Sequence, residues 1–206
     1  MRPLAVVTGG SGGVGGAVIA ELQERGWDTV SLSRRDGCDV SDERHVASAF
    51  ARLPRLDALV NAAAVLTVRP LVDMTAQDWD EQLNAGLRGP FLCSREAFRR
   101  MAPGGTIVMV SSLSGVTGAE KFPGMAAYVA AKSGLAGLTE VLAVEGRSLG
   151  IRVNAVSPGA VDTPMVQRAG IGGPRLKPRE VAGVIAWLCS PESTPLSGAN
   201  LRLDPS

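Results

Sequence analysis

The sequence has little of several residue types from which reactive sites are commonly built: among its 206 residues there are one histidine, one tyrosine and three cysteines. The cysteines, Cys38, Cys93 and Cys189, are far apart and show no C-x-x-C spacing. This pattern indicates neither a disulfide framework nor a zinc site, so we expect reduced, mostly buried thiols. A histidine-based hydrolase or metal centre would depend on His45 alone. That residue lies in a polar helix start, so we predict a surface position and no metal site.

An excess of charge of either sign is also missing, and so are long apolar runs. Lys and Arg number 21 against 20 for Asp and Glu, which gives a formal net charge of +1 and no basic surface suited to nucleic acid. We find no run near the roughly 20 apolar residues that cross a bilayer, and the amino end lacks a signal-peptide core. The sequence therefore predicts a cytoplasmic protein, folded as one domain over residues 1–206, without nucleic-acid or membrane partners.

Glycine, in contrast, is abundant where an apolar run, Leu4–Val7, gives way to helical periodicity from Val14 onward. Six glycines stand between Thr8 and Ala17, so the stretch is typical of strand, phosphate loop and helix. Such a loop brings backbone N–H groups close to an anion, although a purely structural glycine turn would look similar. We predict that a dinucleotide pyrophosphate binds here, at Gly9, Ser11, Gly12, Gly13, Val14 and Gly15.

The end of the second predicted strand, Thr29–Ser33, carries arginines where an acid would favour NAD. Arg34 and Arg35 follow Ser33 directly. A guanidinium pairs with a phosphate through two hydrogen bonds, so the pair predicts a 2′-phosphate and NADP(H) as the cofactor. The alternative is that both arginines are simply solvated.

The next connection is unusually short. Only residues 34–38 separate the second strand from Asp39 and Val40, whereas a parallel strand normally needs a crossover of about a dozen residues. We infer that the chain steps across the strand ends and brings Asp39 and Val40 beside the adenine. Alternating apolar runs and helical segments continue to residue 203. They predict an α/β fold, namely a single doubly wound Rossmann-type domain with a mostly parallel sheet of six or seven strands, in which the helix between the second and third strands is missing or vestigial.

Together, the motifs resemble the short-chain dehydrogenase/reductase family from Thr8 to about Asp204. The resemblance rests on the glycine spacing, on Asp39-Val40, on Asn61-Ala-Ala-Ala64, on Ser112, on Tyr128-x-x-x-Lys132 and on Asn154 to Thr163. It implies an NADP(H)-dependent oxidoreductase that interconverts a ketone and a secondary alcohol, and a homo-oligomer, either dimer or tetramer. By resemblance, Ser112, Tyr128 and Lys132 are catalytic, and further cofactor contacts are Asn61, Ala62, Ala63, Tyr128, Lys132, Pro158, Gly159, Val161 and Thr163.

Tyr128 and Lys132 lie four residues apart, which places them on one face of a helix. A neighbouring ammonium favours the phenolate, so we expect the Tyr128 pKa to fall below its ordinary value near 10 and Tyr128 to act as general acid/base. Without the family pattern, a buried tyrosine and a solvated lysine would explain the pair equally well.

One departure from the family pattern concerns proton relay. Gly86 stands where the family usually has an asparagine that supports a relay water, and we expect Asn84 to point from a different helix face. Pro90 leaves the Gly86 carbonyl without its helical donor, so we predict that this carbonyl still binds the water. The departure motivates an alternative function, a weakly active or non-catalytic NADP(H)-binding regulatory or scaffold protein.

The substrate is predicted only in outline. The loops expected to line its pocket, residues 65–74, 119–127 and 165–175, are mostly apolar and favour a small or hydrophobic carbonyl compound. Asp204-Pro-Ser206 replaces the terminal Asp-Gly usual in the family, near a common subunit contact.

Overall fold

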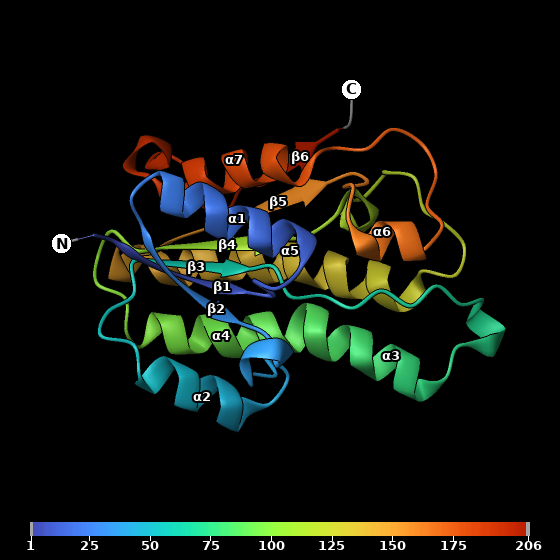
Figure 1. Ribbon diagram of the computed structural model, residues 1–206, viewed down its shortest axis with the longest axis horizontal. Helices are drawn as coiled ribbons and strands as arrows, with labels where there is room; N and C mark the ends of the chain where they lie inside the picture. Colours follow the sequence, from blue (N-terminus) through green and yellow to red (C-terminus); the bar gives the residue numbers. More distant parts are fainter. Residues whose placement is uncertain (1, 205–206) are drawn as a thin grey trace.

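The computed structural model describes residues 2–204, which form one six-stranded parallel sheet with helices on both faces (Figure 1). The order of the strands across the sheet is β2-β1-β3-β4-β5-β6, and each neighbouring pair is parallel. This arrangement confirms the predicted α/β, Rossmann-type fold. The strands are β1 (Leu4–Thr8), β2 (Asp28–Leu32), β3 (Ala58–Asn61), β4 (Thr106–Val110), β5 (Arg152–Pro158) and β6 (Asn200–Leu203).

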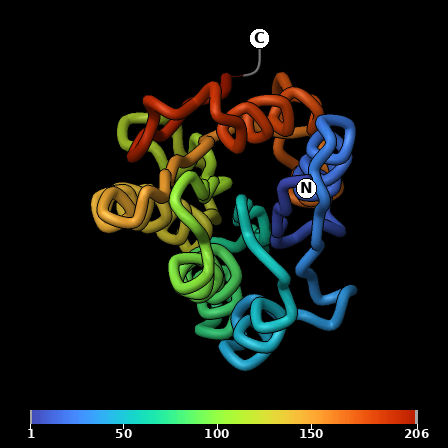
Figure 2. The backbone as a smooth tube through the Cα atoms, turned by 90° about the vertical axis from the view of Figure 1, so that its left-hand side faces the viewer, coloured from blue at the N-terminus to red at the C-terminus, as the bar shows by residue number. Residues whose placement is uncertain are grey.

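The helices form two layers, which Figure 2 shows from the side. One face of the sheet is covered by α1 (Gly13–Glu24) and α7 (Pro178–Cys189), and the other by α2 (Glu43–Ala51), α4 (Gly89–Phe98) and α5 (Ala126–Gly146). Two further helices, α3 (Ala76–Leu83) and α6 (Pro164–Arg168), lie toward the carboxyl ends of the strands. The inner strands β1, β3 and β4 are buried along their whole length, as expected for parallel strands between two helix layers.

The connection after β2 is as short as the sequence predicts. A single 3₁₀ turn, η1 (Arg34–Asp36), is followed by Gly37 with φ +77°, and the Cys38 N–H donates back to the Ser33 carbonyl at 2.9 Å. Asp39 and Val40 belong to no strand, so β2 remains at the edge of the sheet. As predicted, no helix lies between β2 and Asp39; α2 follows these residues and precedes β3, because Asp39 and Val40 form no strand of their own.

The long helix predicted from residue 78 to residue 101 is divided. Between α3 and α4 lies a π-helical turn, η3 (Asn84–Arg88), in which the Gly89 N–H reaches the Asn84 carbonyl. Pro90 has no N–H to continue an α-helical pattern, which explains the change in hydrogen bonding. Gly86 is buried in this turn, and a Cβ added to it would lie 3.2 Å from the Ala131 Cβ.

Helix α5 corrects one expectation. With its last turn it spans Ala126–Leu149, and by length and mean hydropathy this segment could cross a membrane. The sequence reading of no apolar run of that length was therefore wrong. In the structure, one face of α5 packs on β5 and carries the buried Lys132 and Leu135, whereas Val141 and Val144 on the helix are exposed. The segment Asp204-Pro-Ser206, which replaces the terminal Asp-Gly usual in the family the sequence resembles, includes residues 205 and 206, which lie outside the described residues.

Candidate active site

A cavity of about 770 Å³ opens at the carboxyl ends of the strands. Parallel strands bring these ends, and the loops that follow them, to one edge of the sheet. Of the residues predicted from the sequence, all but Asn61 line this cavity. They are Gly9, Ser11, Gly12, Gly13, Val14, Gly15, Arg34, Arg35, Asp39, Val40, Ala62, Ala63, Ser112, Tyr128, Lys132, Pro158, Gly159, Val161 and Thr163.

The glycine loop has the shape of an anion cradle. Gly9 has φ +67°, and a Cβ there would lie 2.8 Å from the Ala63 Cα, so only glycine lets the loops that follow β1 and β3 approach so closely. The Thr8 hydroxyl accepts hydrogen bonds from the N–H groups of Ala62 and Ala63, which fixes the two strand ends together. Gly12, the N-cap of α1, has no side-chain cap, which leaves the first N–H groups of the helix open to phosphate oxygens. These features fit a bound dinucleotide.

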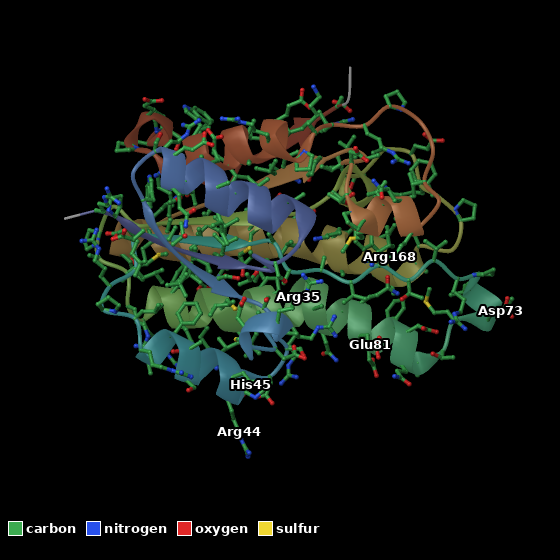
Figure 3. All side chains as sticks on the ribbon, viewed as in Figure 1. Arg35, Arg44, His45, Asp73, Glu81 and Arg168 are labelled. Carbon is green, nitrogen blue, oxygen red and sulfur yellow. The ribbon has the colours of Figure 1, made fainter. Side chains whose placement is uncertain are left out.

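Guanidinium groups line the cavity on the side of β2. Arg34 and Arg35 are exposed, and within residues 2–204 neither takes part in an ion pair. Arg168 also lines the cavity, from the end of α6 (Figure 3). Positive charge without a partner at this position is suited to phosphate groups.

Three predicted catalytic side chains come from the end of β4 and the start of α5. The Ser111 hydroxyl donates to the Lys132 carbonyl at 3.0 Å, and the Ser133 hydroxyl donates to the Gly115 carbonyl at 3.1 Å. A Cβ on Gly115 would lie 2.6 Å from the Lys132 carbonyl carbon, so this glycine permits close packing. The loop after β4 is thereby fixed against α5, with Ser112 beside Tyr128.

The electrostatics of Tyr128 differ from the sequence prediction. Burial raises the pKa of the Tyr128 hydroxyl, and a hydrogen bond with the Ser112 side chain offsets only part of that rise. The Lys132 ammonium lies over the ring face, with Nζ 5.6 Å from the ring centroid. Desolvation is the largest cause of the shift, and the Lys132 ammonium does not reverse it, so the expected fall of the Tyr128 pKa is wrong for this arrangement. Tyr128 is a neutral phenol at pH 7, in the form that donates a proton.

Lys132 is 3% exposed, and its ammonium donates a hydrogen bond of 2.6 Å to the Val110 carbonyl. Burial lowers the Lys132 pKa to about 8. The group is thus charged at neutral pH but close to its titration range.

Asn61 does not line the cavity with the other predicted residues. Its side chain lies among buried groups, where Nδ2 is 3.3 Å from both the Ser94 Oγ and the Met109 Sδ. Its Oδ1 is buried and has no hydrogen-bond partner among the described residues. Consecutive side chains of a strand point to opposite faces, and at the end of β3 this turns Asn61 toward α4.

The structure adds cavity residues that the sequence reading missed. Glu81, Asn84 and Ala85 line the cavity from one face of the divided helix, whereas Gly86 does not line it and faces Ala131, so Asn84 and Gly86 lie on different faces as expected. Their spacing of three and four residues is a helical signal that was available in the sequence. Other additions are Leu32, Ser33, Cys38, Ser41, Ala64, Val110, Ser111 and Pro164.

The predicted substrate loops contribute unequally. Val65 and three residues of α6, Met165, Val166 and Arg168, line the cavity, whereas no residue of 119–127 does. A side cavity of about 490 Å³ opens next to it, lined by Arg34, Ala64, Val65, Leu66, Val68, Met165, Arg168 and Ala169.

The cysteines and the histidine are the other reactive residue types in the chain. All three cysteines are free and buried, as predicted, and burial raises the pKa of each thiol. His45 is exposed, also as predicted. Over residues 2–204, no group of three or more His, Cys, Asp or Glu side chains is arranged to hold a metal ion.

Comparison with known proteins gives matches along nearly the whole chain. The family model described as "Enoyl-(Acyl carrier protein) reductase" matches residues 17–205. Cyclopentanol dehydrogenase from Comamonas sp. (strain NCIMB 9872) is 35% identical, covering 98% of this chain and 95% of its own. Cis-4-hydroxycyclohexanecarboxylate dehydrogenase from Sinomonas cyclohexanicum is 37% identical, with coverage of 98% and 94%. A short-chain dehydrogenase from Burkholderia cenocepacia J2315, solved in complex with NADP, is 29% identical, with coverage of 98% and 96% and a TM-score of 0.84.

Proposed function

Because the chain belongs to the short-chain dehydrogenase/reductase family, we propose that this oxidoreductase uses NADP(H) to interconvert a ketone and a secondary alcohol, with Tyr128 as general acid/base. The observation that carries the proposal is that Ser112, Tyr128 and Lys132 line the same cavity as the glycine loop. A binding or scaffold role would not require these three side chains together, so we favour an enzyme.

The chemistry follows from the protonation states. When bound, the nicotinamide supplies or takes up a hydride at the substrate carbon. In reduction, the neutral Tyr128 hydroxyl donates its proton to the carbonyl oxygen, which becomes the alcohol oxygen. The Ser112 hydroxyl donates a hydrogen bond to the same oxygen, and the Lys132 ammonium stabilises the phenolate that Tyr128 becomes. Oxidation reverses these steps, with Tyr128 taking the proton from the alcohol.

The preference for NADP(H) rests on charge. Arg34 and Arg35 lie beside the end of β2, and both line the cavity, so we assign the 2′-phosphate to them. Arg168 supplies a third guanidinium for the cofactor phosphates from the end of α6. The complex of the Burkholderia cenocepacia relative with NADP supports the choice of cofactor.

For the substrate we propose a cyclic secondary alcohol or the matching ketone. The two relatives named above act, by their names, on cyclopentanol and on a hydroxycyclohexane carboxylate. The apolar side chains Val65, Met165 and Val166 suit a saturated ring. We further propose that the protein is cytoplasmic and that it forms a homo-oligomer. The oligomer is proposed because Val141 and Val144 on α5 and Phe91 on α4 are exposed apolar side chains that a second copy would cover.

A screen of cyclic ketones, in which turnover is monitored as the loss of NADPH absorbance, tests the proposal. We expect turnover with the wild type, and Tyr128→Phe should lower kcat by about 10²–10⁴-fold while NADPH binding persists. Full activity in Tyr128→Phe would exclude Tyr128 as the acid. NADPH binding without turnover of any ketone or alcohol would instead favour the scaffold alternative.

A further inference from the structure

A carboxylate stands next to the arginines of the proposed 2′-phosphate site. In η1, the Asp36 Oδ2 accepts hydrogen bonds of 2.6 Å from both the Ser31 and the Ser33 hydroxyls. These hydrogen bonds lower the Asp36 pKa below its ordinary value, so the group is an anion at neutral pH. The short connection fixes its position, since Gly37 turns the chain and the Cys38 N–H returns to the Ser33 carbonyl.

Asp36 determines whether the Ser33 hydroxyl donates or accepts a hydrogen bond in the cavity. Ser33 is buried and lines the cavity beside Arg34 and Arg35. A serine hydroxyl has one hydrogen, and here that hydrogen is donated to Asp36. Ser33 is therefore left as an acceptor, which suits the donating 2′-hydroxyl of NAD(H). A phosphate monoester, whose second pKa is about 6, is mostly without protons at pH 7 and offers no such donor.

The charge of Asp36 acts in the same direction. It lies close enough to Arg35 for that guanidinium to lower its pKa as well, so the carboxylate partly neutralises a cation needed by the phosphate. Arg34 and Arg35 attract a 2′-phosphate, whereas Asp36 repels it. Two opposing influences are thus built into residues 33–36.

We propose that Asp36 is a specificity-determining residue that weakens discrimination for the 2′-phosphate, so that the protein accepts both NADPH and NADH. This inference rests on the proposed function, because it assumes that the adenosine ribose lies at the end of β2. Asp36→Asn removes the charge and leaves Arg35 uncompensated, and its amide, which is a weaker acceptor and also a donor, holds the Ser33 hydroxyl less firmly than the carboxylate does. Both changes favour NADPH.

The test is the dissociation constant of each reduced dinucleotide, measured by its fluorescence on binding to the full-length protein. Asp36→Asn should lower the NADPH constant about tenfold and leave the NADH constant unchanged or higher. Asp73→Asn is the matched control, because Asp73 is an exposed carboxylate far from the cavity, in η2 (Leu71–Asp73) (Figure 3). We expect no change of either constant there.

A second variant covers the case in which Asp36→Asn fails to fold. Ser33→Ala removes the acceptor and should raise the NADH constant about threefold without weakening NADPH. If the wild type binds both dinucleotides and neither variant changes the ratio of the two constants, the inference is overturned and the proposed function stands. A wild type that binds neither dinucleotide overturns both.

Discussion

The ammonium of Lys132 lies 2.6 Å from the carbonyl oxygen of Val110, inside a site where the lysine is 3% exposed. The folded protein therefore holds at neutral pH a charge that water would solvate better. Burying the Lys132 ammonium lowers the free energy of unfolding, and the rest of the fold offsets this cost, as is common for functional groups.

Lys132→Met should raise the free energy of unfolding by about 1–3 kcal/mol at pH 6.5 and abolish turnover. In the wild type, burial lowers the Lys132 pKa from 10.5 to about 8, so the unfolded chain binds more protons between these values and stability rises with pH there. The gain of the variant should consequently shrink by pH 9.5. Denaturant titrations at both pH values measure this, and a variant less stable than the wild type at pH 6.5 would contradict it.

The pH dependence of turnover should report Tyr128. Because burial raises its pKa, the protonation of Tyr128 should keep ketone reduction level near neutrality and lower it at high pH, whereas alcohol oxidation should rise with pH. Ser112→Ala removes the hydrogen bond that lowers this pKa, so both transitions should move to higher pH in the residual activity. Lys132, with a pKa of about 8, titrates in both proteins, so the difference between the two profiles isolates Tyr128. Identical profiles would argue against Tyr128 as the titrating acid.

Gly13→Ala should raise the NADPH dissociation constant about tenfold, because the new methyl would lie 2.5 Å from the Thr163 Cγ2. Thr163→Ser removes that Cγ2 and keeps the hydroxyl that caps α6, but the Thr163 Cβ, 2.9 Å from the new methyl, remains, so the double variant should recover part of the affinity. Gly183→Ala, at a position in α7 with open space around it, is the control and should bind as the wild type does. No rescue in the double variant would mean that the clash is not the cause.

Gly86→Asn should raise kcat, because an amide there can hold a water that relays protons near Lys132. Gly86→Ala is the matched control: it adds the same Cβ, 3.2 Å from the Ala131 Cβ, without the amide. Both variants should lose a similar amount of thermal stability, and only the asparagine should gain turnover. If kcat of both variants is equal to or lower than that of the wild type, the relay needs no side chain at this position.

Val144→Glu should convert the proposed oligomer to monomers, because it introduces a charge on the exposed apolar face of α5. Val72→Glu, at an exposed valine in η2 on another part of the surface, should leave the assembly unchanged. Light scattering coupled to size-exclusion chromatography gives the masses. A monomeric wild type would contradict the proposed oligomer directly.

The sequence by itself determined the order of the elements, the glycine loop, the short connection after β2 and the helical pairing of Tyr128 with Lys132. Each is a local property, set by hydrophobic period, by backbone freedom at glycine or by the length of a connection. Only the tertiary structure decided that Tyr128 is neutral, that Asn61 faces away from the cavity, that Asn84 faces into it and that Asp36 binds the Ser33 hydroxyl. Burial, desolvation and side-chain direction depend on segments far apart in the chain, such as β4 against α5, and no local pattern encodes them.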